Sequence, residues 1–223
     1  MLKEFDLDAP DQTKETRYEF RMQTRCVTAL YERRFTAPKS TGKEWKILVE
    51  VVRQVTKPKI RDLLGVLTVQ LQGDVGVFLS LPEAEKKRQT LKWLSSGIRM
   101  VADDAGWPLD SFRTAEGEVI RLNYVNSWIW KTPKPNPLRT VTAEVFVEHH
   151  LTEVLISIRF RTSAGALLNT ERLIADIPTE FAFIKYFGKL QWKDNETVEL
   201  ISKDGKQTWQ AKVSTFGMTT DLK

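Results

Sequence analysis

The feature that most constrains the fold is a strict alternation of apolar and charged residues in several short segments. From Arg17 to Thr36, apolar or small side chains occupy the even positions up to Leu30, while charged or polar side chains occupy the odd positions up to Arg25. A period of two residues is typical of a β-strand with one buried face. The segment therefore predicts a strand with one side in the core and the other in water.

The same alternation returns at several later points in the chain. Residues 45–51 are predicted to form the hairpin partner of the first strand, and 64–81 to form a second hairpin that turns at Gly73 and Asp74. Further strands are predicted at 120–130, in a hairpin of 140–150 with 153–162, at 167–177, and in a last hairpin over 197–213 that turns at Asp204 and Gly205. These segments together predict a mainly antiparallel sheet built from hairpins.

Two segments show helical signals instead. Pro82 followed by Glu83 marks a helix start, and apolar residues then recur at spacings of three and four until Gly106. This pattern predicts one long helix over about 82–105. A second, short and aromatic helix is predicted over about 178–188, beginning at a proline and ending at a glycine. The predicted fold class is therefore α+β.

The domain organisation follows from length and element order. A chain of 223 residues can bury a core as one large domain or two small ones. Residues 14–107 and 118–215 both show a run of strands and a helix that begins at a proline, which suggests a weak duplication with little residue identity. We expect a single α+β domain over 1–223 and keep the duplication as the alternative.

Cysteine usage and hydropathy exclude several classes of protein. Cys26 is the only cysteine, so the chain forms no internal disulfide and no four-cysteine zinc site. Its position among apolar residues predicts a small core residue. No uncharged apolar run approaches the roughly 20 residues that a membrane span needs, and the N-terminus lacks the apolar core of a secretory signal. We expect a cytoplasmic protein without membrane association.

Charge is unevenly placed along the chain, although the net charge is only +5. Residues 1–13 carry four acidic residues against one lysine, whereas residues 14–61 carry 13 Lys or Arg against five Glu. Two structural explanations are open: the acidic segment folds back on the basic one, or the basic one is the solvated face of two strands. The functional explanation is a surface for an acidic partner. On that explanation Arg17, Arg21 and Arg25 are candidate partner-binding residues.

The segment "NSWIWKTPKPNPLR" (126–139) is the second candidate surface. Its two tryptophans precede a loop rich in proline and cations, a composition suited to binding. The candidate partner-binding residues here are Trp128, Trp130, Lys131, Lys134 and Arg139. The structural alternative is that both rings lie on the inner face of a strand, because large rings are most often packed in cores. We expect the rings to be mostly buried and the loop, with its three prolines, to be exposed.

No motif fixes a reaction. His149 and His150 are adjacent, so in a strand they point to opposite faces and cannot both hold one ion, although Glu148 and His150 share a face. A polar hairpin turn explains them better than a metal site. The chain has no G-x-S-x-G elbow, Walker loop or G-x-G-x-x-G fingerprint. We therefore predict no catalytic residues, no metal and no cofactor.

Without a reaction signature, the sequence favours a non-catalytic binding protein that holds an acidic protein partner, compatible with a bacterial inhibitor or immunity-type protein. The first alternative is a nucleic-acid-binding module that uses the basic strands within 14–61. The second alternative is an enzyme whose site is assembled from distant residues and leaves no local motif.

Overall fold

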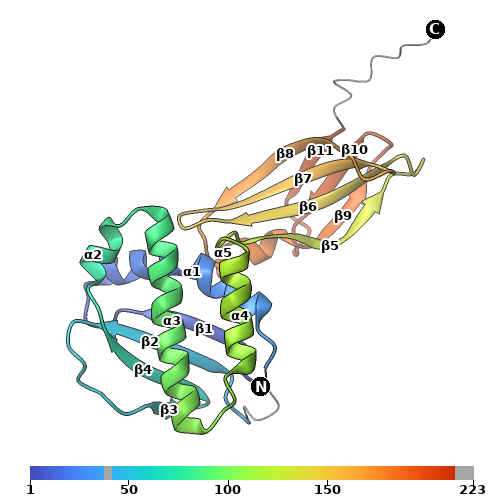
Figure 1. The fold of residues 1–223 in the computed structure, drawn as a ribbon. Helices are drawn as coiled ribbons and strands as arrows, with labels where there is room; N and C mark the ends of the chain where they lie inside the picture. The colour runs from blue at the N-terminus through green and yellow to red at the C-terminus, as the bar shows by residue number, and fades with distance from the viewer. Residues whose placement is uncertain (38–41, 214–223) are drawn as a thin grey trace. The chain divides into compact units, whose positions relative to one another are not determined.

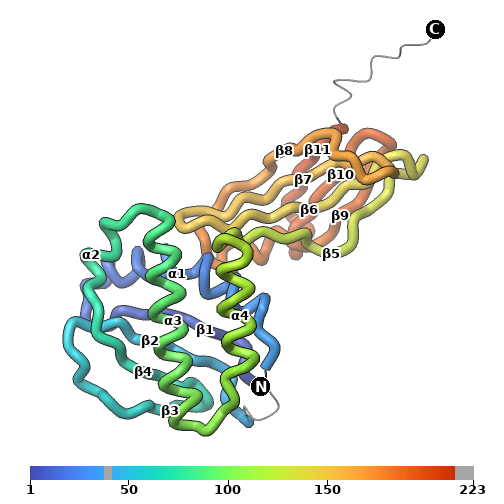
Figure 2. The backbone as a smooth tube through the Cα atoms, in the orientation of Figure 1, coloured from blue at the N-terminus to red at the C-terminus, as the bar shows by residue number. Residues whose placement is uncertain are grey.

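The structure, a computed structural model, describes residues 1–37 and 42–213. Contacts within the chain divide it into two compact units, Met1–Asn126 (unit 1) and Ser127–Lys223 (unit 2). Figure 2 traces the backbone from blue to green through unit 1 and on to red in unit 2. The chain is an α+β protein with antiparallel sheets, as the sequence predicts.

Unit 1 contains a four-stranded sheet in the order β1-β2-β4-β3. Its strands are β1 (Glu4–Asp8), β2 (Lys46–Val52), β3 (Arg61–Leu63) and β4 (Val66–Gln72). The first three strands in that order are parallel, and β3 joins β4 as a short antiparallel edge. The register aligns Phe5 with Ile47 and Ile47 with Leu67, so apolar side chains line one face of the sheet.

In the part of unit 1 that the structure describes, four α-helices accompany this sheet (Figure 1). They are α1 (Lys14–Arg34), α2 (Val75–Ser80), α3 (Glu83–Ala105) and α4 (Asp110–Arg121). Helix α3 confirms the long helix predicted over 82–105. It starts directly after Pro82 and ends at Gly106, whose positive φ of 67° is the left-handed conformation that glycine adopts at little cost.

The strand predicted from Arg17 to Thr36 is wrong, because this segment is helix α1. Its buried positions include Phe20, Thr24, Val27 and Tyr31, which recur at the spacings of three and four that define a helix face. Thr13 caps the first turn, since its side chain accepts a hydrogen bond from the Thr16 amide. The sequence alternation is real, but it does not set the burial.

The hairpin predicted over 64–81 is also wrong after its first strand. Gly73 and Asp74 end β4 and start α2 instead of turning a hairpin, because the Asp74 side chain accepts a hydrogen bond from the Val77 amide as a helix cap. The strand predicted over 120–130 begins inside α4, and only its last residues belong to a strand. Strand β2 confirms the extended segment at 45–51, but it pairs in parallel with β1 and β4 and forms no hairpin.

Unit 2 is built from antiparallel strands, as predicted. The sheet β5-β6-β7-β8 comprises β5 (Ser127–Pro135), β6 (Val141–His149), β7 (Val154–Thr162) and β8 (Leu167–Asp176), and a three-stranded sheet comprises β9 (Lys189–Trp192), β10 (Thr197–Ile201) and β11 (Thr208–Lys212). The β6–β7 and β10–β11 hairpins and the strand at 167–177 are confirmed. Their inward residues, including Val145, Ile156 and Val198, form the core of the unit.

The short helix predicted over 178–188 is present in part. It consists of α5 (Glu180–Phe183) and one 3-10 turn, η2 (Ile184–Tyr186). Phe183 and Phe187 are buried in the core of unit 2, one helical turn apart. Their burial explains why so short an aromatic segment is ordered.

The border between the two units lies at residues 126 and 127, whereas the halves suggested by element order run over 14–107 and 118–215. The single domain and the duplication both stay predictions. No helix in the described part of the chain combines the length and the apolar character that crossing a membrane requires.

Candidate partner-binding site

The three candidate arginines, Arg17, Arg21 and Arg25, lie on α1, and two of them bind acidic side chains of unit 1. Arg17 donates from Nε and Nη2 to the two oxygens of Asp8, at 2.7 and 2.5 Å. This fork-to-carboxylate pairing raises the pKa of the guanidinium. Arg21 is exposed and forms no ion pair with any described residue. Two of the three candidate residues are thus at least partly neutralised within the fold.

Arg25 helps to hold the edge strand β1 in place. Its guanidinium contacts Asp6 at 3.0 Å and Glu32 at 2.7 Å, and Glu32 in turn accepts a hydrogen bond from the Phe5 amide at 2.9 Å. Strand β1 is an edge strand, so an unpaired amide there would offer a site for pairing with another chain. Burial raises the pKa of Glu32 despite the Arg25 charge beside it. We interpret Arg25 as a structural residue.

The acidic N-terminal segment accounts for part of the charge pattern in the sequence. Asp6 and Asp8 stand on β1, where they pair with Arg25 and Arg17 of α1, and Asp6 also binds Lys46 of β2. The structure therefore agrees with the first of the two structural explanations: the acidic segment folds back on the basic one. Among the described residues of 14–61, the cations of α1 do not form a free strand face.

The two candidate tryptophans, Trp128 and Trp130, are half-buried and face the core of unit 2. Trp130 stacks on Phe187 with ring centroids 5.2 Å apart, and Trp128 lies 6.4 Å from Phe183. Both rings pack against the core of unit 2. Because the indoles fill the space beside α5 and η2, the expectation that they line the inner face of a strand agrees with their position, although neither ring is fully covered.

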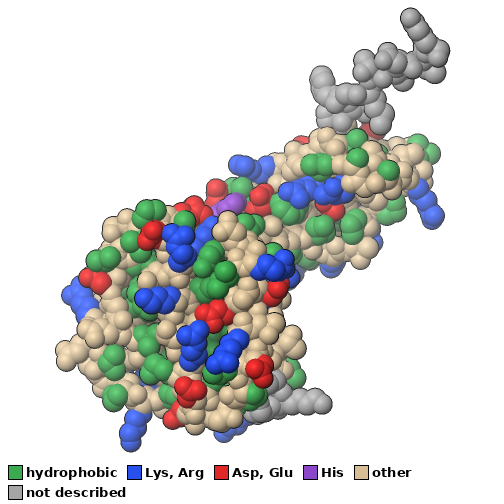
Figure 3. Space-filling view, viewed as in Figure 1, with side chains coloured by type: hydrophobic (Ala, Val, Ile, Leu, Met, Phe, Trp, Pro, Cys, Tyr) green, Lys and Arg blue, Asp and Glu red, His purple; other side chains and the backbone are tan. Residues whose placement is uncertain are grey.

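The turn between β5 and β6 places its charged side chains in solvent. We call residues 131–140 the basic hairpin. Lys131, Lys134 and Arg139 are exposed, and Leu138 among them is 66% exposed. Lys131 lies over the Trp130 ring at 4.4 Å, while Lys134 and Arg139 form no ion pair with any residue that the structure describes. In Figure 3, Lys and Arg side chains project from the end of unit 2 where these strands lie.

Buried polar groups hold the basic hairpin in one conformation. Asn136 is buried; its Oδ1 accepts hydrogen bonds from the Thr140 and Val141 amides, and its Nδ2 donates to Thr140 Oγ1 and to the Asn195 carbonyl. The Trp192 indole donates to the Lys134 carbonyl at 2.8 Å. Asn136 is not among the residues predicted from sequence, although an Asn-Pro pair is a recognised turn signal that marks this position.

The backbone of the basic hairpin also carries two residues in the left-handed region. Lys131 has φ of 59° and Arg139 has φ of 57°. The register of β5 against β6 shifts between Trp130 and Lys134, which is the mark of a bulge. A bulge redirects side chains, and here it carries the chain from the core-facing tryptophans to the exposed cations. The strand reaches Pro135, so the expected loop is largely an extension of the ladder.

His149 lies at the end of β6 and His150 directly after it, and the two differ in burial. His149 is buried at the end of β6, where Nε2 lies 3.1 Å from the Pro178 carbonyl and donates to it, and the ring meets the edge of Phe183. Within residues 1–37 and 42–213, no group of three or more His, Cys, Asp or Glu side chains is placed to hold a metal ion. Cys26 is buried, and desolvation raises the pKa of its thiol to about 12.

Comparisons with protein-family models, with curated proteins and with solved structures found no match for this chain.

Proposed function

We propose that this chain is a non-catalytic binding protein that holds an acidic protein partner through the basic hairpin. The observation that carries the proposal is a set of exposed cations around an exposed apolar side chain on a fixed turn. Lys134 and Arg139 flank Leu138, and Asn136 fixes the backbone between them. An apolar side chain surrounded by polar and charged ones follows the core-and-rim arrangement of protein interfaces.

Rigidity supports the same proposal. A side chain that is already held in its bound position loses little conformational freedom on association, so more of the contact energy remains as affinity. The hydrogen bonds of Asn136 and of the Trp192 indole hold the turn before any partner arrives.

A protein partner suits the hairpin better than single-stranded nucleic acid does. Bases stack on exposed aromatic faces, and each stacked base contributes about 1–3 kcal/mol. The candidate rings, Trp128 and Trp130, instead pack beside Phe183 and Phe187 in unit 2. The alternative based on strands within 14–61 loses its premise too, because α1 takes the place of the first strand and two of its arginines are paired with carboxylates.

The experiment is affinity capture from a lysate of the native host, with the purified chain as bait and mass spectrometry of the retained proteins. It is run with and without nuclease. The test variant is the double reversal Lys134→Glu with Arg139→Glu, and the matched control is Arg21→Glu, which reverses an exposed charge on α1. We expect the bait to retain one acidic protein at one-to-one stoichiometry, also after nuclease treatment. The affinity for this protein should fall by at least about tenfold in the double variant and stay unchanged in Arg21→Glu.

Other outcomes would contradict the proposal. Recovery that disappears with nuclease, with a steep loss in salt, would assign the surface to nucleic acid. Loss of the partner with Arg21→Glu and not with the double variant would move the interface to α1. A finer form of the proposal is a cytoplasmic inhibitor or immunity-type protein. It predicts that a captured enzyme loses its activity when the chain is added at equal molar amount.

A further inference from the structure

Unit 1 contains a cavity at the carboxyl end of β4, independent of the proposed partner surface. It is a hollow of about 470 Å³, open to solvent on one side, between the end of β4, helix α2 and one side of α3. Its lining combines apolar walls with several polar side chains along the rim. This volume lies within the range of roughly 300–1,000 Å³ that small-molecule sites occupy.

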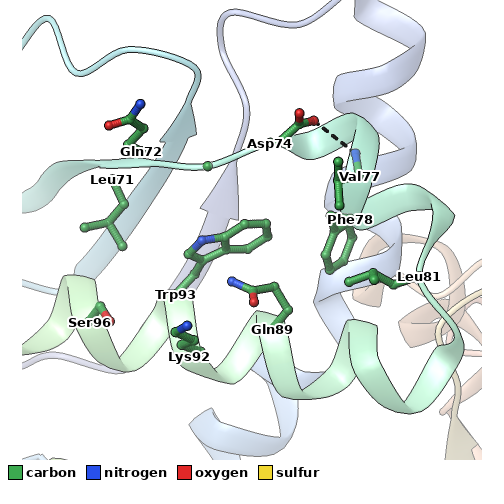
Figure 4. A pocket seen from close by; sticks show the side chains of 11 residues that line it. Leu71, Gln72, Asp74, Val77, Phe78, Leu81, Gln89, Lys92, Trp93 and Ser96 are labelled. Atoms are coloured by element: carbon green, nitrogen blue, oxygen red, sulfur yellow. Dashed lines mark hydrogen bonds between the residues drawn. The ribbon is translucent and has the colours of Figure 1, made fainter.

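The floor of the cavity is aromatic. Trp93 of α3 and Phe78 of α2 lie with ring centroids 5.4 Å apart, and both are buried. Figure 4 shows Trp93 rising from α3 toward the segment that joins β4 to α2, with Leu71 pointing from β4 toward α3. Leu81 closes the far side beside Phe78. A flat apolar ring would therefore meet aromatic and branched aliphatic surface on several sides.

Backbone packing keeps the cavity next to Trp93. At Gly73, a Cβ atom would lie 2.6 Å from Val51 Cγ1 and 2.9 Å from Trp93 Cζ2, so no larger residue fits without displacing one of them. The backbone at Gly73, directly after β4, therefore packs against the Trp93 indole, and Asp74 caps α2 at the next position. Ligands in open sheets with parallel strands bind outside the carboxyl ends of those strands, which is where this cavity lies.

Most polar side chains along the rim have no partner among the described residues. Gln89, Lys92 and Ser96 project from α3 at spacings of three and four, so they form one stripe along the cavity. Their side chains make no hydrogen bond or ion pair within the described residues, and the same holds for Gln72 at the end of β4. The Asp74 carboxylate differs, because it is engaged as the cap of α2. Lys92 is the only cation among the lining residues.

We propose that this cavity binds a small aromatic carboxylate. The ring would occupy the space over Trp93 and Phe78, and the acidic group would face Lys92, with Gln89 and Ser96 as hydrogen-bond donors to its oxygens. A carboxylate accepts several hydrogen bonds and donates none, so the free donors along this stripe suit it. Its charge pairs with the single lysine, while Asp74, the one carboxylate of the lining, lies at the other end of the cavity beside the Val77 amide that donates to it.

The test uses the full ¹⁵N-labelled chain with two probes that share one ring, indole-3-acetate and its neutral analogue indole-3-acetamide. Amide spectra are recorded during titration with each probe. We expect shifts confined to the amides that border the cavity, at 71–81 and 89–96. We expect the acid to bind about three- to fivefold more tightly than the amide, the ratio that one exposed ion pair contributes.

Variants separate recognition of the ring from recognition of the charge. Lys92→Gln should abolish the difference between the probes, and Arg88→Gln, which removes a charge outside the cavity on the same helix, should preserve it. Ser96→Phe should fill the cavity and abolish the shifts with both probes while the remaining spectrum is unchanged. Equal affinities for the two probes would overturn the role of Lys92. Shifts elsewhere, or none, would overturn the site.

Discussion

A single buried asparagine determines whether the candidate interface is a fixed surface or a loose loop. Asn136 uses both ends of its carboxamide, with the oxygen on the amides of Thr140 and Val141 and the nitrogen on Thr140 Oγ1 and the Asn195 carbonyl. No other side chain of that size offers donors and an acceptor in this arrangement. Stability and binding are therefore linked at this one residue.

Asn136→Ala should lower the free energy of unfolding by about 1–3 kcal/mol, because it removes the partners of several polar groups at a buried position. The same change should weaken capture of the acidic partner, since the exposed cations would lose their fixed positions. Urea denaturation followed by tryptophan fluorescence measures the first effect. Asn195→Ala is the matched control: Asn195 contributes only its backbone carbonyl to the contact, so its stability should stay within about 0.5 kcal/mol of the parent. Equal losses in both variants would contradict the role given to the Asn136 side chain.

At the scale of an element, the β3–β4 turn carries visible backbone strain. Leu64 and Gly65 have φ of 52° and 80°, the pair of positive values that a two-residue type I′ hairpin requires. Gly65 suits this conformation, whereas leucine does not, and Leu64 is also 89% exposed. The Trp45 indole donates to the Leu64 carbonyl, and the Asp62 side chain accepts from the Gly65 amide, so neighbouring groups hold the turn closed.

Leu64→Asn should raise the free energy of unfolding by about 1 kcal/mol, because asparagine tolerates the left-handed region and an exposed leucine gives up little burial. Thermal and urea unfolding measure the change. Leu63→Asn is the control at the neighbouring exposed leucine, whose φ is not positive, and it should be neutral or slightly destabilising. If Leu64→Asn proves less stable than the parent, the leucine side chain makes contacts that its exposure does not suggest.

An element could be predicted from sequence when its spacing of apolar residues fitted either a strand or a helix but not both. Positions 17, 21 and 25 are an even number apart, as a strand face requires, and also four apart, as a helix face requires, so their charges could not separate α1 from a strand. The β6–β7 hairpin is different, because Ile156, Ile158 and Phe160 are buried and alternate with the less buried Arg159 and Arg161, and this spacing has no helical counterpart. The hairpin was therefore predicted correctly, whereas the longer alternation at 17–30 was not.

Other predictions failed because the local sequence does not show which distant strand or helix a segment contacts. Strand β1 is short and pairs only with β2, about 40 residues later, so nothing near it indicates a parallel ladder. The Gly73-Asp74 pair serves a helix cap as well as a hairpin turn, and only α2 decides between them. For the candidate site, exposure of the loop cations could be predicted from the prolines, whereas the pairing of Arg17 and Arg25 with Asp8 and Asp6 needed the fold.

At the scale of the whole molecule, the chain combines two different architectures. Unit 1 has a largely parallel sheet with helices, and unit 2 is antiparallel with its own core around Val145, Ile156 and Val198. Unit 1 ends at Asn126, whose Nδ2 donates to the Cys26 carbonyl at 2.6 Å, so the last residue of this unit is tied to its own helix α1. The division falls where buried contacts change from one core to the other.

We predict that the chain divided between residues 126 and 127 gives two fragments that fold alone, because each unit holds enough residues for a core of its own. Far-ultraviolet circular dichroism and the dispersion of amide resonances test each fragment, and its urea transition should be cooperative. A second division between residues 107 and 108, inside unit 1, is the control. It should leave the 1–107 product unfolded, because it separates α4 from the α1 helix against which it packs through Phe112 and Tyr31, whereas the 108–223 product should keep unit 2 folded. If the 1–126 fragment is unfolded while the intact chain unfolds in one transition, the single domain over 1–223 expected from sequence is the correct description, and the two units stabilise each other.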